Sequence, residues 1–288
     1  MEEIILQRKL EALGQNGTLI RKDGKTFLQL DCENAKELSM KWGEKLYPFT
    51  KTGKKWILEL PFSTAVNYVQ ICVDGQEVLS PDLPIAHGYC RPYNYIELPD
   101  EEGLFELRDV PHGTLTQEFY KSKISDNWEK LIVYLPPCVP SAGLPVLYLQ
   151  HGFGESEISW STTGKVNFLM DNLIAAGKIK PFAIVMGNGM VKQRIDGELK
   201  LNRALYGQML VEEILPMIEK KYQFGGSKEK RGMAGLSMGS VQTTRTICAH
   251  PELFSEVGIF SGFLRDRIVG DEEHDGIVPV SYTHLRAH

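Results

Sequence analysis

The sequence of 288 residues has few cysteines and no long apolar run. Its five cysteines are widely scattered and form no Cys-x-x-Cys pair, so they indicate neither a zinc site nor a disulfide framework. No stretch approaches the roughly 20 apolar residues of a membrane-spanning helix. We therefore expect buried free thiols, no membrane partner, no metal and no cofactor.

Strong positive charge is also absent. The formal net charge is -5 and no long run of lysine or arginine occurs, which argues against a nucleic-acid partner. The chain starts Met1-Glu2-Glu3 without an apolar signal core, so the sequence predicts a cytoplasmic protein. With 42% hydrophobic residues, the chain can bury a core in two domains or one large one. Nothing in the sequence indicates an oligomeric state.

Short alternating apolar runs dominate residues 15–80, and Asp74-Gly75 after the last run is typical of a hairpin turn. The predicted strands are Thr26–Leu30, Leu38–Trp42, Trp56–Leu60 and Tyr68–Val73. This pattern predicts a small immunoglobulin-like β-sandwich over residues 15–80. Trp42 and Trp56 are candidates for a sugar-stacking face, although positions in the sandwich core are favoured.

The segments on either side of the predicted sandwich lack its pattern of short alternating apolar runs. Residues 1–14 are interpreted as a lead-in segment, a short helix. Residues 81–103 contain four prolines and little periodicity, so they are interpreted as an ordered, Pro-rich linker.

Strands alternate with helices over residues 104–288, which predicts an α/β-hydrolase domain. Two strands come first, and then apolar strands alternate with two helices, the second bent at Pro216. The predicted elements are Thr114–Ser122, Lys130–Leu135, Leu147–Gln150, Val166–Ile174, Phe182–Met186, Leu210–Tyr222 and Glu256–Gly262. The expected fold is a mostly parallel sheet with helices on both faces, whose ligands bind at the carboxyl ends of the strands.

The central motif of this domain is G-x-S-x-G at Gly235, Ser237 and Gly239. A small apolar run precedes it, and a helix follows that ends before Pro251. Strand, sharp turn and helix are the context in which this motif presents a nucleophilic serine. The sequence therefore predicts Ser237 as the nucleophile and the backbone N–H of Met238 as an oxyanion donor.

A second motif, His151-Gly152-Phe153-Gly154, follows an earlier apolar strand. Hydrolases of the α/β type place another oxyanion donor in such a loop. The N–H of Phe153 is the first choice, with Gly152 or Gly154 next. His151 is not interpreted as the catalytic base, because in this fold the base follows the serine in the chain.

The combined motifs resemble the esterase D-like family. That family includes enterochelin esterases, the feruloyl and acetylxylan esterases of the first carbohydrate esterase family, and related mycolyltransferases. The matching segments are Asp109–Gly113, Tyr134–Pro137, His151–Gly154 with Trp160, Met186–Gly189, Ala234–Gly239, His250–Phe254 and Phe260–Gly262. A β-module also precedes the hydrolase in some members.

The resemblance covers about residues 105–262. It implies a Ser237 nucleophile and an oxyanion hole formed by Met238 and Phe153. The candidate substrate-binding residues are Gly152, Gly154, Trp160 and Asn188. One departure is Ser240, where the family commonly has glycine.

The larger departure follows Phe260, after which no convincing strand is predicted. The carboxylates and histidines beyond Ser237 do not stand in the family's Gly-His-x-Trp-like setting. They are Asp266, Asp271, Asp275, His274, His284 and His288. We therefore expect a C-terminally truncated hydrolase without its triad acid and base, with atypical residues 263–288. This predicts an exposed edge strand near Val257–Phe260 and weak catalysis.

The leading hypothesis for function is a serine carboxylic-ester hydrolase that forms an acyl-Ser237 intermediate. Its expected substrate is a small-molecule or oligosaccharide ester, with feruloyl or acetyl esters of carbohydrates first and siderophore trilactones such as enterochelin second. Two further alternatives are an acyltransferase of the same fold and a catalytically dead, truncated hydrolase with a carbohydrate-binding module.

Overall fold

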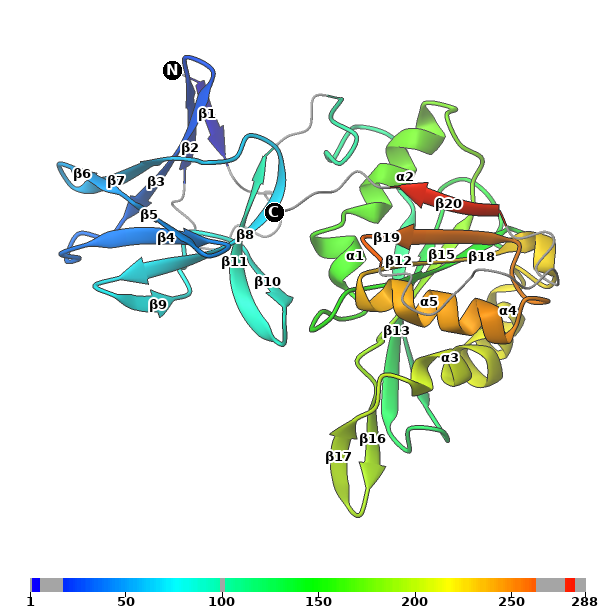
Figure 1. Cartoon of the computed structure of the whole chain (residues 1–288). Helices are drawn as coiled ribbons and strands as arrows, with labels where there is room; N and C mark the ends of the chain where they lie inside the picture. Colours follow the sequence, from blue (N-terminus) through cyan, green and yellow to red (C-terminus); the bar gives the residue numbers. More distant parts are fainter. Residues whose placement is uncertain (1, 6–17, 99–101, 263–277, 283–288) are drawn as a thin grey trace. The chain divides into compact units, whose positions relative to one another are not determined.

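The computed structural model describes residues 2–5, 18–98, 102–262 and 278–282. The chain divides into two compact units, residues 1–103 and residues 104–287 (Figure 1). No helix in the described ranges has both the length and the apolar character that crossing a membrane requires.

The N-terminal unit consists of two antiparallel sheets. One has the strand order β1-β2-β3-β7-β6, and the other has the order β10-β11-β8-β4-β5 with β9 paired to β8. The strands are β1 (Glu2–Ile5), β2 (Thr18–Lys22), β3 (Lys25–Asp31), β4 (Leu38–Trp42), β5 (Lys45–Pro48), β6 (Thr50–Thr52), β7 (Lys55–Glu59), β8 (Ala65–Val73), β9 (Gln76–Val78), β10 (Ile85–Gly88) and β11 (Arg91–Leu98). Alternate residues of both sheets share one buried cluster, among them Leu28, Met40, Trp56, Ile71 and Ile96. The unit is therefore a two-sheet sandwich.

All four strands predicted for residues 15–80 are present, but both flanking segments differ from the prediction. Glu2–Ile5 is a strand and not a helix, and residues 6–14 lie outside the described part. The linker interpretation of residues 81–103 is wrong for β10 and β11, which pair with each other and with β8. Asn94 hides the strand pattern because this polar residue is buried and hydrogen-bonds the backbone of Ser80 and Leu83.

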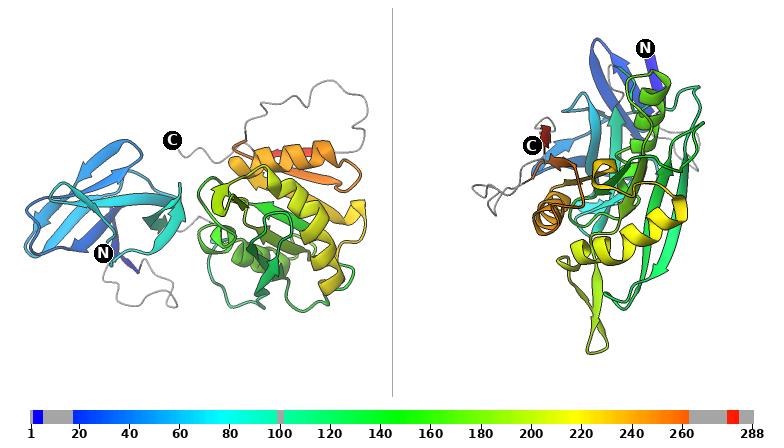
Figure 2. Two further views of the ribbon diagram at one scale, coloured as in Figure 1. Left: turned by 90° about the horizontal axis from the view of Figure 1, so that it is seen from below. Right: turned by 90° about the vertical axis from the view of Figure 1, so that its right-hand side faces the viewer.

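Figure 2 shows the second unit, which combines helices and strands, from two further sides. Its main sheet has the order β12-β13-β15-β14-β18-β19-β20. The sheet is mixed. Strands β12 and β13 are antiparallel to their neighbours, whereas β15, β14, β18, β19 and β20 are parallel to one another. Its strands are β12 (Thr114–Lys121), β13 (Trp128–Leu135), β14 (Val146–Gln150), β15 (Ala183–Gly187), β18 (Arg231–Leu236), β19 (Glu256–Phe260) and β20 (Val278–Tyr282). A separate hairpin joins β16 (Lys192–Ile195) to β17 (Glu198–Leu201) and projects from the unit in Figure 1.

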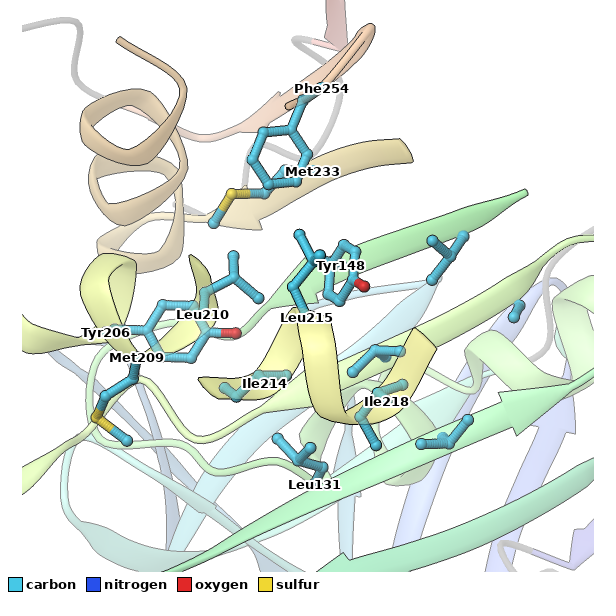
Figure 3. Packing of buried hydrophobic residues seen from close by; sticks show 14 of the residues in the cluster. Leu131, Tyr148, Tyr206, Met209, Leu210, Ile214, Leu215, Ile218, Met233 and Phe254 are labelled. Atoms are coloured by element: carbon cyan, nitrogen blue, oxygen red, sulfur yellow. The ribbon is translucent and has the colours of Figure 1, made fainter. Parts of the chain in front are cut away.

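Helices cover both faces of this sheet. The described helices are α1 (Ser159–Thr162), α2 (Val166–Ala175), α3 (Leu205–Met209), η1 (Leu210–Ile214), α4 (Leu215–Tyr222), η2 (Lys228–Lys230) and α5 (Met238–Ala249). On one face, Val166 and Met170 of α2 join a cluster with Ile184 of the sheet. On the other, residues of α3, η1 and α4 pack near Tyr148 and Met233 (Figure 3). Val185 of the sheet and Ile247 of α5 belong to the same cluster.

The long helix predicted over Leu210–Tyr222 does not run as one regular α-helix. A π-helical turn, η1, joins α3 to α4 directly before Pro216, which is in the first turn of α4. Proline has no N–H to continue an α-helical ladder, and a wider turn accommodates that missing bond. The sequence predicted the position of the irregularity but not its form.

The C-terminal prediction is also corrected. Strand β20 pairs in parallel with β19, so Val257–Phe260 is not the exposed edge that the sequence predicts. Pro279 within β20 weakens the sequence signal, but an edge strand tolerates a proline.

The cysteines are free, as predicted, but most of them are not buried. Cys72 is buried and Cys32 half-buried, whereas Cys90, Cys138 and Cys248 are exposed. Composition identifies the absence of a disulfide pattern and gives no information on burial.

Candidate active site

The turn between β18 and α5 holds Ser237 in an unusual backbone conformation. Its φ is 51° and its ψ is -109°, outside the regions that non-glycine residues normally adopt. The backbone N–H of Ser237 donates to the carbonyl of Phe260 at 2.9 Å, which fixes the turn against the end of β19. The side chain is half-buried. A strained residue between a strand and a helix is the arrangement that lifts a serine hydroxyl clear of a sheet.

Two glycines make this sharp turn possible. A Cβ added to Gly235 would overlap the carbonyl of Gly239. A Cβ added to Gly239 would lie 2.7 Å from the carbonyl oxygens of both Gln150 and His151. The helix N-terminus therefore sits directly against the carboxyl end of β14. The G-x-S-x-G spacing is thus explained by close approach on both sides of the serine.

The loop after β14 has three candidate oxyanion donors, and two of their N–H groups are already used. The N–H of Gly152 donates to Oε2 of Glu155 at 2.8 Å, and that of Gly154 donates to Sδ of Met190 at 3.4 Å. Within the described residues, the N–H of Phe153 has no hydrogen-bond partner. Phe153 is therefore the member of this loop whose N–H is available to bind an oxygen.

Met238 offers the second available donor. As the first residue of α5, it has no intrahelical acceptor for its N–H, and the positive end of the helix dipole lies there. Strands β14 and β18 pair in parallel with Gln150 opposite Gly235, so the loop of Phe153 and the start of α5 are at the same edge of the sheet.

His151 is a buried structural residue. Its Nδ1 donates to the carbonyl of Gly152 at 2.7 Å, and its Nε2 accepts from the N–H of Gly189 at 3.0 Å. Both ring nitrogens are occupied, so the histidine ties the loop after β14 to the loop after β15. Burial lowers the pKa of His151, which keeps the ring neutral and preserves the acceptor at Nε2.

The two remaining candidate substrate-binding residues are Trp160 and Asn188. Trp160 in α1 is half-buried, with its ring centroid 5.9 Å from that of Phe260. Its Nε1 is buried without a hydrogen-bond acceptor among the described residues. Asn188, after β15, accepts from the N–H of Met190 at 2.9 Å and also interacts with His151.

Two residues of the site were missed by the sequence reasoning. Gln242 in α5 donates to the carbonyls of Gly189 and Arg203 at 2.9 and 3.0 Å, which joins α5 to two loops. The guanidinium of Arg203 lies over the ring of Phe153, 5.1 Å from its centroid. Neither belongs to a motif, and only the folded chain brings Arg203 to the loop of Phe153.

A catalytic base is not found in the described part of this unit. His112 hydrogen-bonds Asp171 and the carbonyl of Arg108, and His250 pairs with Glu252 at 3.5 Å. No described histidine hydrogen-bonds Ser237. Among these same residues, no three His, Cys, Asp or Glu side chains are grouped as metal ligands.

The site and fold place the chain among proteins with an esterase-type α/β architecture. A model of the Esterase family matches residues 122–275, more than half of the chain. The chain therefore belongs to the esterase family.

A curated relative is an endo-1,4-beta-xylanase/feruloyl esterase from Xylanibacter ruminicola, 31% identical over 264 residues. The match covers 86% of this chain but only 36% of the relative, so the chain spans about a third of that protein's length.

Two solved structures share the fold. A ferulic acid esterase from Anaeromyces mucronatus, in complex with ferulic acid, is 21% identical with a TM-score of 0.52, over 57% of this chain and 64% of that one. The enterobactin esterase of Shigella flexneri, in the presence of enterobactin, is 12% identical with a TM-score of 0.63, over 85% and 73% of the two chains.

Proposed function

We propose that the second unit is a serine carboxylic-ester hydrolase that forms an acyl-Ser237 intermediate. The observation that carries this proposal is the strained backbone of Ser237 between β18 and α5, beside N–H groups of Phe153 and Met238 that have no acceptor among the described residues. Few other roles account for a half-buried serine held in this conformation beside two unpaired donors.

In this mechanism Oγ of Ser237 attacks the ester carbonyl carbon and gives up its proton to a base. The carbonyl oxygen becomes negative and accepts hydrogen bonds from the N–H groups of Phe153 and Met238. The intermediate expels the alcohol, which takes up the proton, and leaves an acyl ester on Ser237. Water then attacks that ester, releases the acid and restores the serine.

Full activity also requires a base that accepts the proton of Ser237. We retain the prediction that this chain lacks its triad acid and base. Rate enhancement without them would be limited to roughly 10³–10⁴ over water. The histidines and aspartates after residue 262 have no described side-chain positions.

For the substrate we propose feruloyl or acetyl esters of plant cell-wall carbohydrates. The support is the relative named as a xylanase and feruloyl esterase, whose match covers 86% of this chain. For the N-terminal unit we propose an immunoglobulin-like topology. Its strand orders β2-β3-β7-β6 and β5-β4-β8-β11 correspond to the A-B-E-D and C′-C-F-G sheets of that fold.

The test compares the parent chain with Ser237→Ala and a matched surface control, Ser227→Ala. Hydrolysis of p-nitrophenyl acetate and of methyl ferulate is followed by absorbance. We expect slow turnover that Ser237→Ala abolishes and Ser227→Ala preserves. Equal turnover in Ser237→Ala would refute the nucleophile, and fast turnover by the parent chain would refute the missing base.

A further inference from the structure

One sheet of the N-terminal sandwich carries three neighbouring tyrosine rings outside the core, and one of these rings is exposed. Tyr89 and Tyr93 are 6.4 Å apart between ring centroids, and Tyr93 and Tyr68 are 5.8 Å apart. Tyr89 is 72% exposed, and the other two rings are half-buried. We refer to Tyr68, Tyr89 and Tyr93 as the tyrosine cluster. None of its members belongs to the buried core of the sandwich, which is formed by the opposite face of the same sheet.

The turn that carries Tyr89 is conformationally unfavourable. Gly88 pairs with Arg91, so Tyr89 and Cys90 form a two-residue loop between β10 and β11. Their φ values are 49° and 65°. A turn with both central residues at positive φ favours Asn-Gly or Gly-Gly, and a bulky tyrosine in this conformation is strained. The strain brings no burial, because the ring is exposed. Strain of this kind concentrates at binding sites.

Planar polar groups surround the cluster. The guanidinium of Arg91 lies 4.4 Å from the ring centroid of Tyr93 and donates to Glu77 at 3.0 Å. Glu77 also accepts from Gln70 at 2.6 Å and is 3.5 Å from Nζ of Lys41. Glu77 therefore faces two cations, and these three side chains together carry a net charge of only +1. Such a surface does not favour a strongly charged partner such as a nucleic acid.

The tryptophans that the sequence suggested for sugar stacking are elsewhere. Trp56 is 5% exposed and donates from Nε1 to the carbonyl of Cys32. Trp42 packs on Phe62 with ring centroids 5.1 Å apart. Both pack on the interior of the sandwich. Among the described aromatic residues of this unit, Tyr89 is the most exposed, so the tyrosine cluster is the better candidate for binding a ligand.

We propose that the tyrosine cluster, with Arg91, Glu77 and Gln70 at its rim, binds an uncharged polysaccharide chain of the xylan type. Flat rings accept the apolar faces of sugars, and the fixed planar amide, guanidinium and carboxylate groups hydrogen-bond their hydroxyls. The small net charge of Arg91, Lys41 and Glu77 is compatible with a neutral polymer. The choice of xylan rests on the proposed function, because the hydrolase unit would act on esters carried by that polymer.

The test is affinity electrophoresis of the full chain in native gels containing soluble arabinoxylan. Alkali treatment removes ester groups from the polymer, and Ser237→Ala in every protein removes catalysis, so the result does not depend on esterase activity. Gels with soluble starch serve as the comparison polymer. The variants are Tyr89→Ala, the conservative Tyr89→Phe and the control Leu46→Ala, whose side chain is 61% exposed outside the cluster.

We expect arabinoxylan to retard the parent chain, Tyr89→Phe and Leu46→Ala equally. For Tyr89→Ala we expect binding that is weaker by about fivefold or more. Tyr89 is exposed, so the fold should survive, which equal melting temperatures would verify. Three results would overturn the proposal: no retardation of the parent chain, unchanged retardation of Tyr89→Ala, or equal retardation by starch.

Discussion

Gly239→Ala tests whether the close contact beneath Ser237 matters for catalysis. The new Cβ would lie 2.7 Å from the carbonyl oxygens of Gln150 and His151, whereas ordinary contact begins near 3.4 Å. Both oxygens belong to backbone, so neither can rotate away. The start of α5 must therefore move away from β14 by roughly 0.7 Å.

That displacement separates the N–H of Met238 from the N–H of Phe153. A shift of about 1 Å in a catalytic group can cost on the order of 10²-fold, so we expect a loss of about 10- to 100-fold in kcat/KM for p-nitrophenyl acetate. Overpacking should also cost about 1–3 kcal/mol, or about 2–12 °C in Tm for a unit of this size.

The matched control is Gly232→Ala in the same strand-and-turn segment. Its nearest neighbours would be Cβ of Glu256 at 3.3 Å and Cδ1 of Leu147 at 3.4 Å, both on side chains. We expect its activity to stay near that of the parent chain. Parent-like kcat/KM and Tm in Gly239→Ala would refute the reasoning, and so would an equal loss of activity in both variants.

Three further predictions concern buried polar groups. Burial lowers the pKa of His151, so below pH of about 6.5 the unfolded chain binds a proton at this residue that the folded chain does not. The free energy of unfolding, measured with urea, should therefore be lower at pH 5.5 than at pH 7.5. This difference should be smaller in His151→Gln. Burial raises the pKa of Glu129, so ionisation of this carboxyl opposes folding once the pH rises above its pKa in the unfolded chain. Glu129→Gln should therefore increase the free energy of unfolding more at pH 8 than at pH 4. An equal increase at both pH values would count against this reasoning. Asp171→Ala removes the acceptor for Tyr134 Oη at 2.6 Å and for the N–H of Gly113 at 3.0 Å. The free energy of unfolding in urea should therefore fall by about 3–5 kcal/mol, and a fall below about 1 kcal/mol would contradict this prediction.

The sequence predicted the strand, sharp turn and helix around Ser237, because motif and local structure agree there. Gly235 and Gly239 are conspicuous in the sequence, and the clash that each would cause with a side chain explains their spacing. The end of the strand at Gln150 was also placed correctly, because this polar residue follows a continuous apolar run. Where local pattern and tertiary packing coincide, the sequence is sufficient.

The sequence failed where packing alone decides. Strand β11 was missed because buried Asn94 interrupts its apolar alternation, and only the folded chain provides the carbonyls that satisfy it. The hairpin of β16 and β17 was also missed, although Asp196-Gly197, both at positive φ, is typical of a hairpin turn. The polar and apolar residues of β17 alternate, but all four are exposed, so this alternation does not mark a buried face. Arg203 reaches Phe153 through the fold and not through any motif.

The central claim is that the fold presents Ser237 to two free N–H groups. Prolonged treatment with a fluorophosphonate probe, followed by peptide mass spectrometry, tests it most directly. We predict a slow adduct on Ser237 in the folded chain and none on the heat-denatured chain or on Ser237→Ala. Absence of that adduct, or equal labelling of the denatured chain, would contradict the assignment.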